Sequence, residues 1–223
     1  MNFLKKIIFK ILIISIIVSM TMTFTGCPLA EVVEETTPEE TTEEEGVQPT
    51  GQITFTTDRD GKWDIYVMNA DGSEQTRLTD DPQKDCVSDW SPDRKKITFE
   101  SHRDDNWDIY VMNADGSEQI NLTNNPTYDV SPAWSPDGKK IAFVSDRDGN
   151  REIFVMNVDS SELINLTNNP AYDRFSDWST DGKKIVFETD RDGKFEIYVM
   201  NADGSEQINL TNNPADDRFP AWQ

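Results

Sequence analysis

From residue 52 onward the sequence consists of four copies of one unit, each placed 44 residues after the one before. An Ile-x-Phe run and a tryptophan recur with this step, and no insertion or deletion interrupts the register. The recurring tryptophans are Trp90, Trp134, Trp178 and Trp222. A period of about 40–45 residues that holds several short apolar runs and turn signals is typical of a β-propeller blade. The sequence therefore predicts an all-β propeller.

Each unit carries four short runs that we expect to form antiparallel strands, named a to d in chain order. In the unit over residues 131–168 the runs are SPAWS, KKIAFVSD, EIFVMNVD and ELINLT. Asp-Gly pairs lie between many of these runs, and Asp-Gly favours the positive φ angles that tight hairpin turns need. The third run is apolar on both faces, as over Ile65 to Met68. This pattern predicts a strand covered on both sides by neighbouring sheets, with the tryptophan of strand a packed between blades.

The repeat body, residues 51–223, begins with a strand b and finishes with a strand a. Residues 52–55 match the second run of a unit, and residues 219–223 match the first. We therefore expect the last strand to pair with the first, which closes a ring of four four-stranded antiparallel blades and removes open sheet edges. The alternative is a head-to-tail dimer, in which the same pairing between two chains makes eight blades.

Residues 1–26 have the order of a lipoprotein signal peptide. Lysines precede an apolar run from Ile11 to Met20, and small residues follow that run. Phe24-Thr25-Gly26-Cys27 resembles the lipobox of bacterial lipoproteins. The resemblance implies cleavage before Cys27 and acylation of this cysteine, and several acyl chains anchor a protein stably to a membrane. We expect a location in the cell envelope on the extracytoplasmic side, either periplasmic or at the cell surface. The alternative is an uncleaved signal anchor.

An acidic segment follows the predicted lipid site. Residues 27–50 hold eight glutamates and few large apolar side chains, so we expect a disordered linker. The whole chain has a formal net charge of −21 at pH 7. Such a charge repels phosphate backbones, so the sequence argues against nucleic acid as a partner.

The run PAWSPDGKKIAFVSDRDGNREIFVMN, with its W-S-P-D-G-K and D-R-D-G motifs, resembles the WD-like β-propeller repeat of the TolB family. The resemblance covers all four repeats, residues 52–223. It implies a β-propeller and, by analogy with the periplasmic TolB of the Tol–Pal system, a binding role in the envelope. Propellers of this kind usually have six or more blades and often accompany a second domain, as in prolyl oligopeptidase-like peptidases.

The residues needed for familiar catalytic chemistry are scarce. The chain has one histidine, His102, and no Gly-x-Ser-x-Gly motif or Cys/His cluster with metal-ligand spacing. We therefore expect a non-catalytic lipoprotein that binds a protein or glycan partner through the loops or channel mouth of the propeller. The alternatives are an envelope polysaccharide hydrolase or lyase, and a purely structural module.

One acidic position recurs in every repeat, just before strand a. Four-fold geometry would bring these side chains together near the channel mouth, where a bound Ca²⁺ or another divalent cation would relieve their repulsion. The alternative is that each carboxylate caps its own loop by bonding nearby backbone amides. No other cofactor is expected. The candidate metal ligands are Asp85, Asp129, Asp173 and Asp217.

Overall fold

The computed structural model describes residues 51–223, which contain β-strands and connecting loops. The predicted signal peptide over 1–26, Cys27 and the rest of the acidic linker to residue 50 lie outside the described residues. No helix long and apolar enough to cross a membrane occurs among the described residues.

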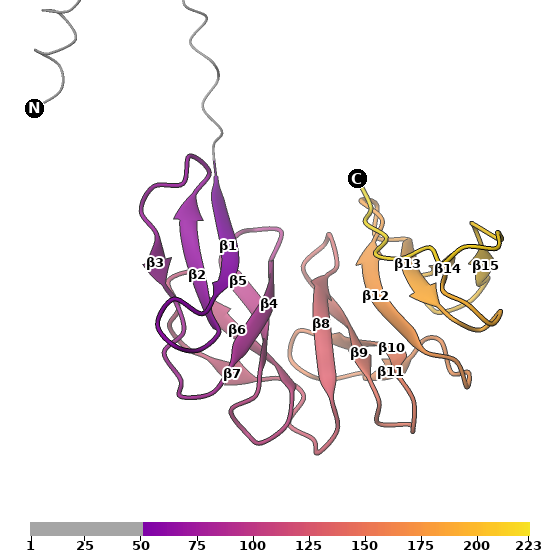
Figure 1. The fold of residues 1–223 in the computed structure, drawn as a ribbon, viewed down its shortest axis with the longest axis horizontal. Helices are drawn as coiled ribbons and strands as arrows, with labels where there is room; N and C mark the ends of the chain where they lie inside the picture. Colours follow the sequence, from indigo (N-terminus) through magenta and orange to yellow (C-terminus); the bar gives the residue numbers. More distant parts are fainter. Residues whose placement is uncertain (1–50) are drawn as a thin grey trace, which may run out of the picture. The chain divides into compact units, whose positions relative to one another are not determined.

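The strands form four antiparallel sheets, in which each strand pairs with the next along the chain (Figure 1). The first sheet holds β1 (Gln52–Thr57), β2 (Asp64–Asn69) and β3 (Thr76–Arg77). The second holds β4 (Asp85–Trp90), β5 (Lys96–Ser101), β6 (Asp108–Asn113) and β7 (Ile120–Asn121). The third holds β8 (Asp129–Trp134), β9 (Lys140–Ser145), β10 (Glu152–Asn157) and β11 (Ile164–Asn165). The fourth holds β12 (Asp173–Trp178), β13 (Lys184–Thr189), β14 (Glu196–Asn201) and β15 (Ile208–Asn209).

Tight turns join the strands as the Asp-Gly pairs predict. Between β8 and β9, the Gly138 N–H donates to the Ser135 carbonyl over 2.8 Å, and Gly138 has φ +69°. The Ser135 hydroxyl donates to Asp137, and the Lys140 N–H donates to the same hydroxyl. A residue without Cβ takes this backbone conformation at little cost, so the glycine fixes the turn and with it the register of the hairpin.

The first strand of every complete blade contains a β-bulge. The register shifts between Cys86 and Ser88 in β4, and at the matching places in β8 and β12. One residue at each bulge has a positive φ, which increases the local bend of the strand. These residues are Val87 (38°), Ser131 (57°) and Phe175 (51°).

The hydrophobic core lies between neighbouring blades. One cluster joins Ile109 and Val111 of β6 to Trp134 of β8 and to Ile141 and Phe143 of β9. A second cluster places Trp178 of β12 between the third and fourth blades in the same way. Trp134 and Trp178 are 7% and 5% exposed, which confirms that the tryptophan of strand a packs between blades.

The four blades follow one another along an open arc (Figure 1). β1 contacts β4, β4 contacts β8 and β8 contacts β12, so the first strands of the complete blades lie side by side. This arrangement of repeated antiparallel sheets confirms the four-bladed propeller architecture.

The predicted pairing of residues 219–223 with β1 is not formed within this chain. Within residues 51–223, β1 pairs only with β2, which leaves the first blade with three strands, and residues 210–223 contain no strand. Among the described strands, none of the first sheet contacts one of the fourth. Figure 1 shows β1 and the C terminus on either side of the opening of the arc. The physical reason is the packing between blades, because large buried side chains such as Phe143 and Trp178 set an angle at which four blades leave the arc open.

Candidate functional site

Three of the predicted cation ligands, Asp85, Asp129 and Asp173, are the first residues of the innermost strands β4, β8 and β12 and are fully buried, whereas Asp217 lies outside any strand. Each of these three accepts hydrogen bonds from an arginine 18 residues later, which comes from the loop between the second and third strands of the same blade. The pairs are Asp85–Arg103 at 3.0 Å, Asp129–Arg147 at 2.9 Å and Asp173–Arg191 at 3.1 Å.

These arginines remove the electrostatic reason for a shared cation. Each buried carboxylate already has a guanidinium partner, and Asp129 and Asp173 also accept from the amides of Asn125 and Asn169. Asp217 accepts from Asn213, and its N–H donates to the Phe195 carbonyl. Within residues 51–223, no group of three or more His, Cys, Asp or Glu side chains is close enough to hold a metal ion. The structure therefore does not bring the four aspartates together.

The arginine partners are also recognisable in the sequence, as a second position that recurs in every repeat. Arginine recurs with the 44-residue step shortly after the second strand of each unit, in a D-R-D motif in three repeats and as His102-Arg103-Asp104 in the second. The members are Arg59, Arg103, Arg147 and Arg191. A repeated Asp and a repeated Arg that lie at the same end of one blade form an ion pair more readily than a four-fold carboxylate ring, since opposite charges attract.

His102 directly follows β5 and packs against an aromatic ring. Its imidazole packs edge-on against Trp107, with ring centroids 5.2 Å apart, and its backbone N–H donates to the Lys84 carbonyl. Cys86 is half-buried, and burial raises the pKa of its thiol to about 11, so the thiolate that would act as a nucleophile is disfavoured.

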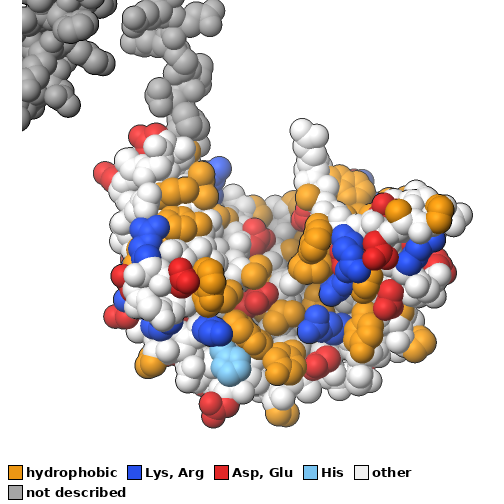
Figure 2. Space-filling model, in the orientation of Figure 1, with side chains coloured by type: hydrophobic (Ala, Val, Ile, Leu, Met, Phe, Trp, Pro, Cys, Tyr) orange, Lys and Arg blue, Asp and Glu red, His pale blue; other side chains and the backbone are white. Residues whose placement is uncertain are grey.

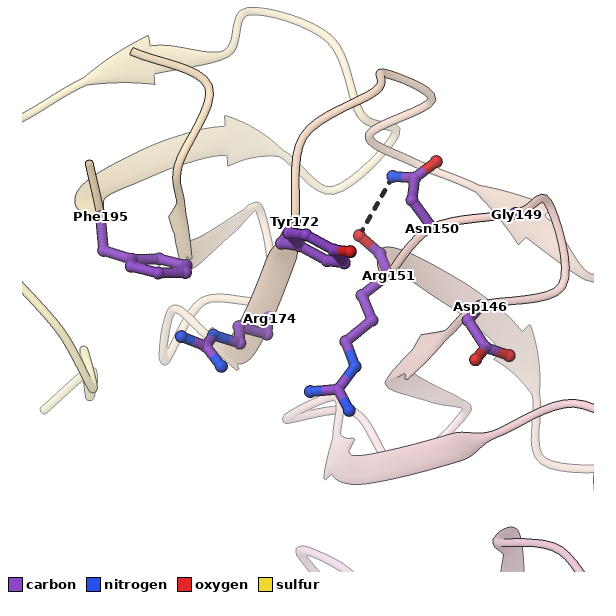
Figure 3. Close-up of a pocket in the computed structure, with 7 residues that line it drawn as sticks. All are labelled: Asp146, Gly149, Asn150, Arg151, Tyr172, Arg174 and Phe195. Atoms are coloured by element: carbon purple, nitrogen blue, oxygen red, sulfur yellow. Dashed lines mark hydrogen bonds between the residues drawn. The ribbon is translucent and has the colours of Figure 1, made fainter. Parts of the chain in front are cut away.

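An open pocket of about 420 Å³ lies between the loops of the third and fourth blades (Figure 3). The loop from β9 to β10 and the approach to β12 supply most of its lining, and β13–β14 adds an aromatic ring. The lining residues are Asp146, Gly149, Asn150, Arg151, Tyr172, Arg174 and Phe195. Asn150 fixes the two loops relative to each other, because its side-chain amide donates to the Asn169 carbonyl at 2.9 Å and to the Ala171 carbonyl at 2.6 Å.

The pocket presents guanidinium groups beside aromatic rings. The guanidinium of Arg174 lies 4.2 Å from the centre of the Phe195 ring and donates to Glu188 at 2.7 Å. Tyr172 is 52% exposed, and Figure 3 shows its ring directed toward the space beside Arg151. Arg151 is exposed and makes no ion pair with a described carboxylate. In Figure 2, basic and apolar side chains lie side by side over the fourth blade.

The sequence contained a signal for this pocket in the positions where the repeats differ. Most positions of the unit hardly change, yet those at this end of the blades vary in size and charge. The position of Arg151 is occupied in the other repeats by Trp63, Trp107 and Phe195. The position of Tyr172 is occupied by Lys84, Tyr128 and Asp216, and that of Arg174 by Cys86, Val130 and Arg218. Variation at one end of an otherwise uniform scaffold indicates binding loops carried on a framework.

Repeated antiparallel blades arranged around their first strands define this protein as a β-propeller. A family model described as the TolB beta propeller domain matches residues 47–131 and 119–223. The chain therefore belongs to the TolB beta-propeller domain family. No curated protein matches the sequence.

Solved structures show the same fold. The chain is similar to the structure assigned to TolB of Agrobacterium tumefaciens, with 28% identity and a TM-score of 0.65, over 71% of this chain and 60% of that one. It is also similar to TolB from Acinetobacter baumannii, with 24% identity and a TM-score of 0.64, over 72% of this chain and 41% of that one. An oligogalacturonate lyase in complex with manganese shares 13% identity, with a TM-score of 0.58 over 71% of this chain and 48% of that one, and thus the fold alone. The chain spans less than two thirds of the length of these proteins.

Proposed function

We propose that this protein is a non-catalytic, lipid-anchored propeller of the cell envelope that binds a protein or glycan partner at the loop pocket of its third and fourth blades. The observation that carries the proposal is the combination of exposed aromatic and guanidinium groups in one concave site, on a molecule that is otherwise strongly acidic. Aromatic rings bury apolar faces of a sugar or a side chain, and arginine binds carboxylates in a planar, two-pronged geometry. The chemistry favours a partner that carries carboxylates.

Arg151 is the decisive group for a test of this site. Arg151 forms no salt bridge with a described carboxylate, although its charge attracts the buried Glu100, and its exposed guanidinium is available to a ligand. Arg174, in contrast, is held by Glu188. We expect Arg151→Glu to weaken binding about tenfold or more, since reversing a charge that contacts an anionic partner costs more than about 1.4 kcal/mol. Tyr172→Ala should weaken binding by removing the exposed ring. The matched control is Leu163→Ala, which also removes an exposed apolar side chain but lies outside the pocket.

The measurement has two arms that use the full chain. In the first, binding to neutral and uronate-containing oligosaccharides is measured by calorimetry. In the second, partners are captured from an envelope extract by crosslinking, identified and titrated. Binding in either arm that depends on Arg151 and Tyr172 but not on Leu163 supports the proposal. Binding that all three variants leave unchanged contradicts it, and chemical turnover of an oligosaccharide would favour the alternative of a hydrolase or lyase.

The proposed anchor is tested separately at Cys27. If acylation of this cysteine holds the protein on the membrane, Cys27→Ser should move it from the detergent phase to the aqueous phase after phase partitioning. Two or more acyl chains are needed for stable anchoring, so the shift should be nearly complete. A variant that stays in the detergent phase would favour the uncleaved signal anchor.

A further inference from the structure

In each complete blade, one arginine ties the innermost strand to the rest of the sheet. Arg103 donates to Ser101 at 2.7 Å, to Gln119 at 2.8 Å and to the buried carboxylate of Asp85 at 3.0 Å. Ser101 ends the second strand of this blade, Gln119 directly precedes its fourth strand, and Asp85 begins its first strand, so Arg103 links all three. The arginine therefore completes its contacts only when strand a is present.

The first blade repeats this arrangement with one partner missing. Arg59 donates to Thr57 at 3.3 Å and to Gln75 at 2.8 Å, which match the first two contacts of Arg103. Arg59 also lies over the rings of Phe55 and Tyr66, as Arg103 lies over Phe99 and Tyr110. It makes no ion pair with any described carboxylate, and it is exposed where Arg103 is half-buried. Arg59 is thus oriented for an aspartate that this chain does not bring to it.

The C-terminal segment is not part of a described sheet but has the local conformation and contacts of a strand a. Phe219 has φ 56°, the bulge conformation that Ser131 (57°) and Phe175 (51°) adopt in complete blades. The Phe219 N–H donates to Glu188 at 2.8 Å, as the Ser131 N–H donates to Glu100 at 2.6 Å. The segment is therefore already shaped and docked on the fourth blade as a first strand.

The tryptophan of this segment shows the same match. The Trp222 N–H donates to Asp177 at 2.7 Å, as the Trp134 N–H donates to Asp89 at 2.8 Å. Trp222 is nevertheless 39% exposed, against 7% for Trp134. A side chain that its equivalents bury between blades stays open here because no described sheet packs over it.

The free edge of β1 is the complementary surface. Ile53 is 43% exposed, whereas Ile97, Ile141 and Ile185 at the equivalent positions are fully buried. In the other blades this edge pairs with strand a, in a register that sets Trp134 opposite Ile141 and Ala133 opposite Ala142. Moving this register by the repeat sets Trp222 opposite Ile53, Ala221 opposite Thr54 and Asp217 opposite Thr57. Asp217 then takes the place beside Arg59 that Asp85 takes beside Arg103.

We propose that residues 217–223 of one copy pair antiparallel with β1 of a second copy, and that the reciprocal pairing joins two chains head to tail into one closed ring. Two open edges that complement each other's shape, hydrogen bonds and charge associate by strand addition. A head-to-tail contact that is repeated by a two-fold rotation closes without leaving an unpaired edge. A second copy is the occupant rather than the chain's own tail, because the packed interfaces between blades hold the two edges apart, on either side of the opening of the arc (Figure 1).

The register predicts a crosslink between two chains. In full chains that carry Cys86→Ser, one copy bears Thr54→Cys and a differently tagged copy bears Ala221→Cys. Treatment of the co-expressed pair with a short bifunctional thiol reagent should give a two-chain product, and each variant alone should give none. A control pair of Thr54→Cys with Asp203→Cys, which changes an exposed turn residue of the fourth blade, should also give none.

The outcomes separate the two ways of closing a ring. If the co-expressed pair gives no product while a single chain with both cysteines crosslinks within itself, the four-bladed ring of one chain is correct and the proposal is overturned. If neither crosslinks, these edges do not pair at all, which overturns it as well.

A charge exchange tests the ion pair that the register predicts. Arg59→Asp and Asp217→Arg should each raise the dimer dissociation constant at least tenfold, because each places like charges opposite one another at both junctions. The double variant should return to within about threefold of the original value. A loss of folding would not be restored by the double variant, so the rescue identifies the pair. Single variants with unchanged dimer affinity would contradict the proposed register.

Discussion

At the scale of single residues, the blades are held by buried polar groups that satisfy one another. Asp129 is fully buried, and it accepts from Arg147 while its neighbour Ser145 accepts from the same arginine. Burial of a charge is costly unless the charge is paired and hydrogen-bonded. The recurring aspartate before strand a is therefore a structural group in the three complete blades.

Asp129→Asn should destabilise the protein by roughly 2–4 kcal/mol, because it leaves the guanidinium of Arg147 without its counter-charge in a mostly buried site. The matched control is Asp80→Asn, which removes a carboxylate that lies 2.8 Å from Arg77 but is 84% exposed. An exposed ion pair contributes about 0–1 kcal/mol, so the control should change little. The measurement is urea unfolding at pH 7, and equal effects of both variants would contradict the structural role of Asp129.

Glu100 makes stability depend on pH. Burial raises the pKa of this carboxyl from 4.5 to about 7, against the opposing effect of the Ser131 N–H that donates to it. Because the folded protein binds the proton more tightly than the unfolded chain, protonation stabilises the fold below about pH 4.5, and this contribution is lost as the pH rises through 7. The carboxylate thus weakens the fold at alkaline pH.

Glu100→Gln should remove this dependence, since the amide oxygen keeps an acceptor for the Ser131 N–H and carries no charge. We expect its free energy of unfolding at pH 8 to exceed that of the unchanged protein by at most about 3 kcal/mol, with little difference at pH 4.5. Glu118→Gln, an exposed glutamate of the same blade, serves as the control. If Glu100→Gln changed the free energy of unfolding by the same amount at pH 4.5 and pH 8, the titration of a buried Glu100 carboxyl would be contradicted.

At the scale of elements, the strands of a blade differ in how much they contribute to the core. β10 has both faces covered, with Ile153 at 0% exposure, whereas β11 is a two-residue outer strand with Ile164 at 48%. The third strand of each blade therefore shares the contacts between blades with the first and second strands, whereas the fourth strand covers an edge.

Ile153→Ala should cost about 2–5 kcal/mol, since it removes buried methyl groups and leaves a cavity between the third and fourth blades. Ile164→Ala is the same change on the exposed strand and should stay within about 0.5 kcal/mol. Thermal unfolding of both variants checks the difference. Similar melting temperatures would mean that the interface between blades is not the main core.

At the scale of the whole molecule, the open arc separates local folding from assembly. The three interfaces between blades have their own buried clusters. β1 has no partner for its free edge in the part of the chain that the structure describes, so the C-terminal segment adds contacts on the fourth blade without completing the first.

Deletion of residues 218–223 should therefore abolish the head-to-tail dimer while leaving a folded monomer. The deletion removes the pairing strand but none of the residues in the three buried clusters. Light scattering of the full chain in detergent gives the number of chains, and circular dichroism reports the fold. Trp222→Lys should also weaken the dimer, because it places a charge where the complete blades bury an indole. A deleted chain that keeps the dimer mass would contradict the role of this segment.

The 44-residue step by itself determined the blade, its four strands, their turns and the burial of tryptophan between blades, because these features depend on local pattern and on contacts between neighbouring units. The pocket at Arg151 and Tyr172 was harder to predict from the sequence, since its residues are those at which the repeats differ. The aspartates show the same limit: their common position was readable from the sequence, but their pairing with arginine was not deduced.

Only the tertiary structure decided whether the ends of the propeller meet. The halves at 52–55 and 219–223 match as strands b and a, and this match is equally consistent with pairing inside one chain or between two. The choice depends on the angle between neighbouring blades, which is set by the packing of side chains such as Phe143, Met156 and Trp178. A small angular difference at each interface accumulates over the arc, so closure is a property of all the interfaces together and is not encoded in any single repeat.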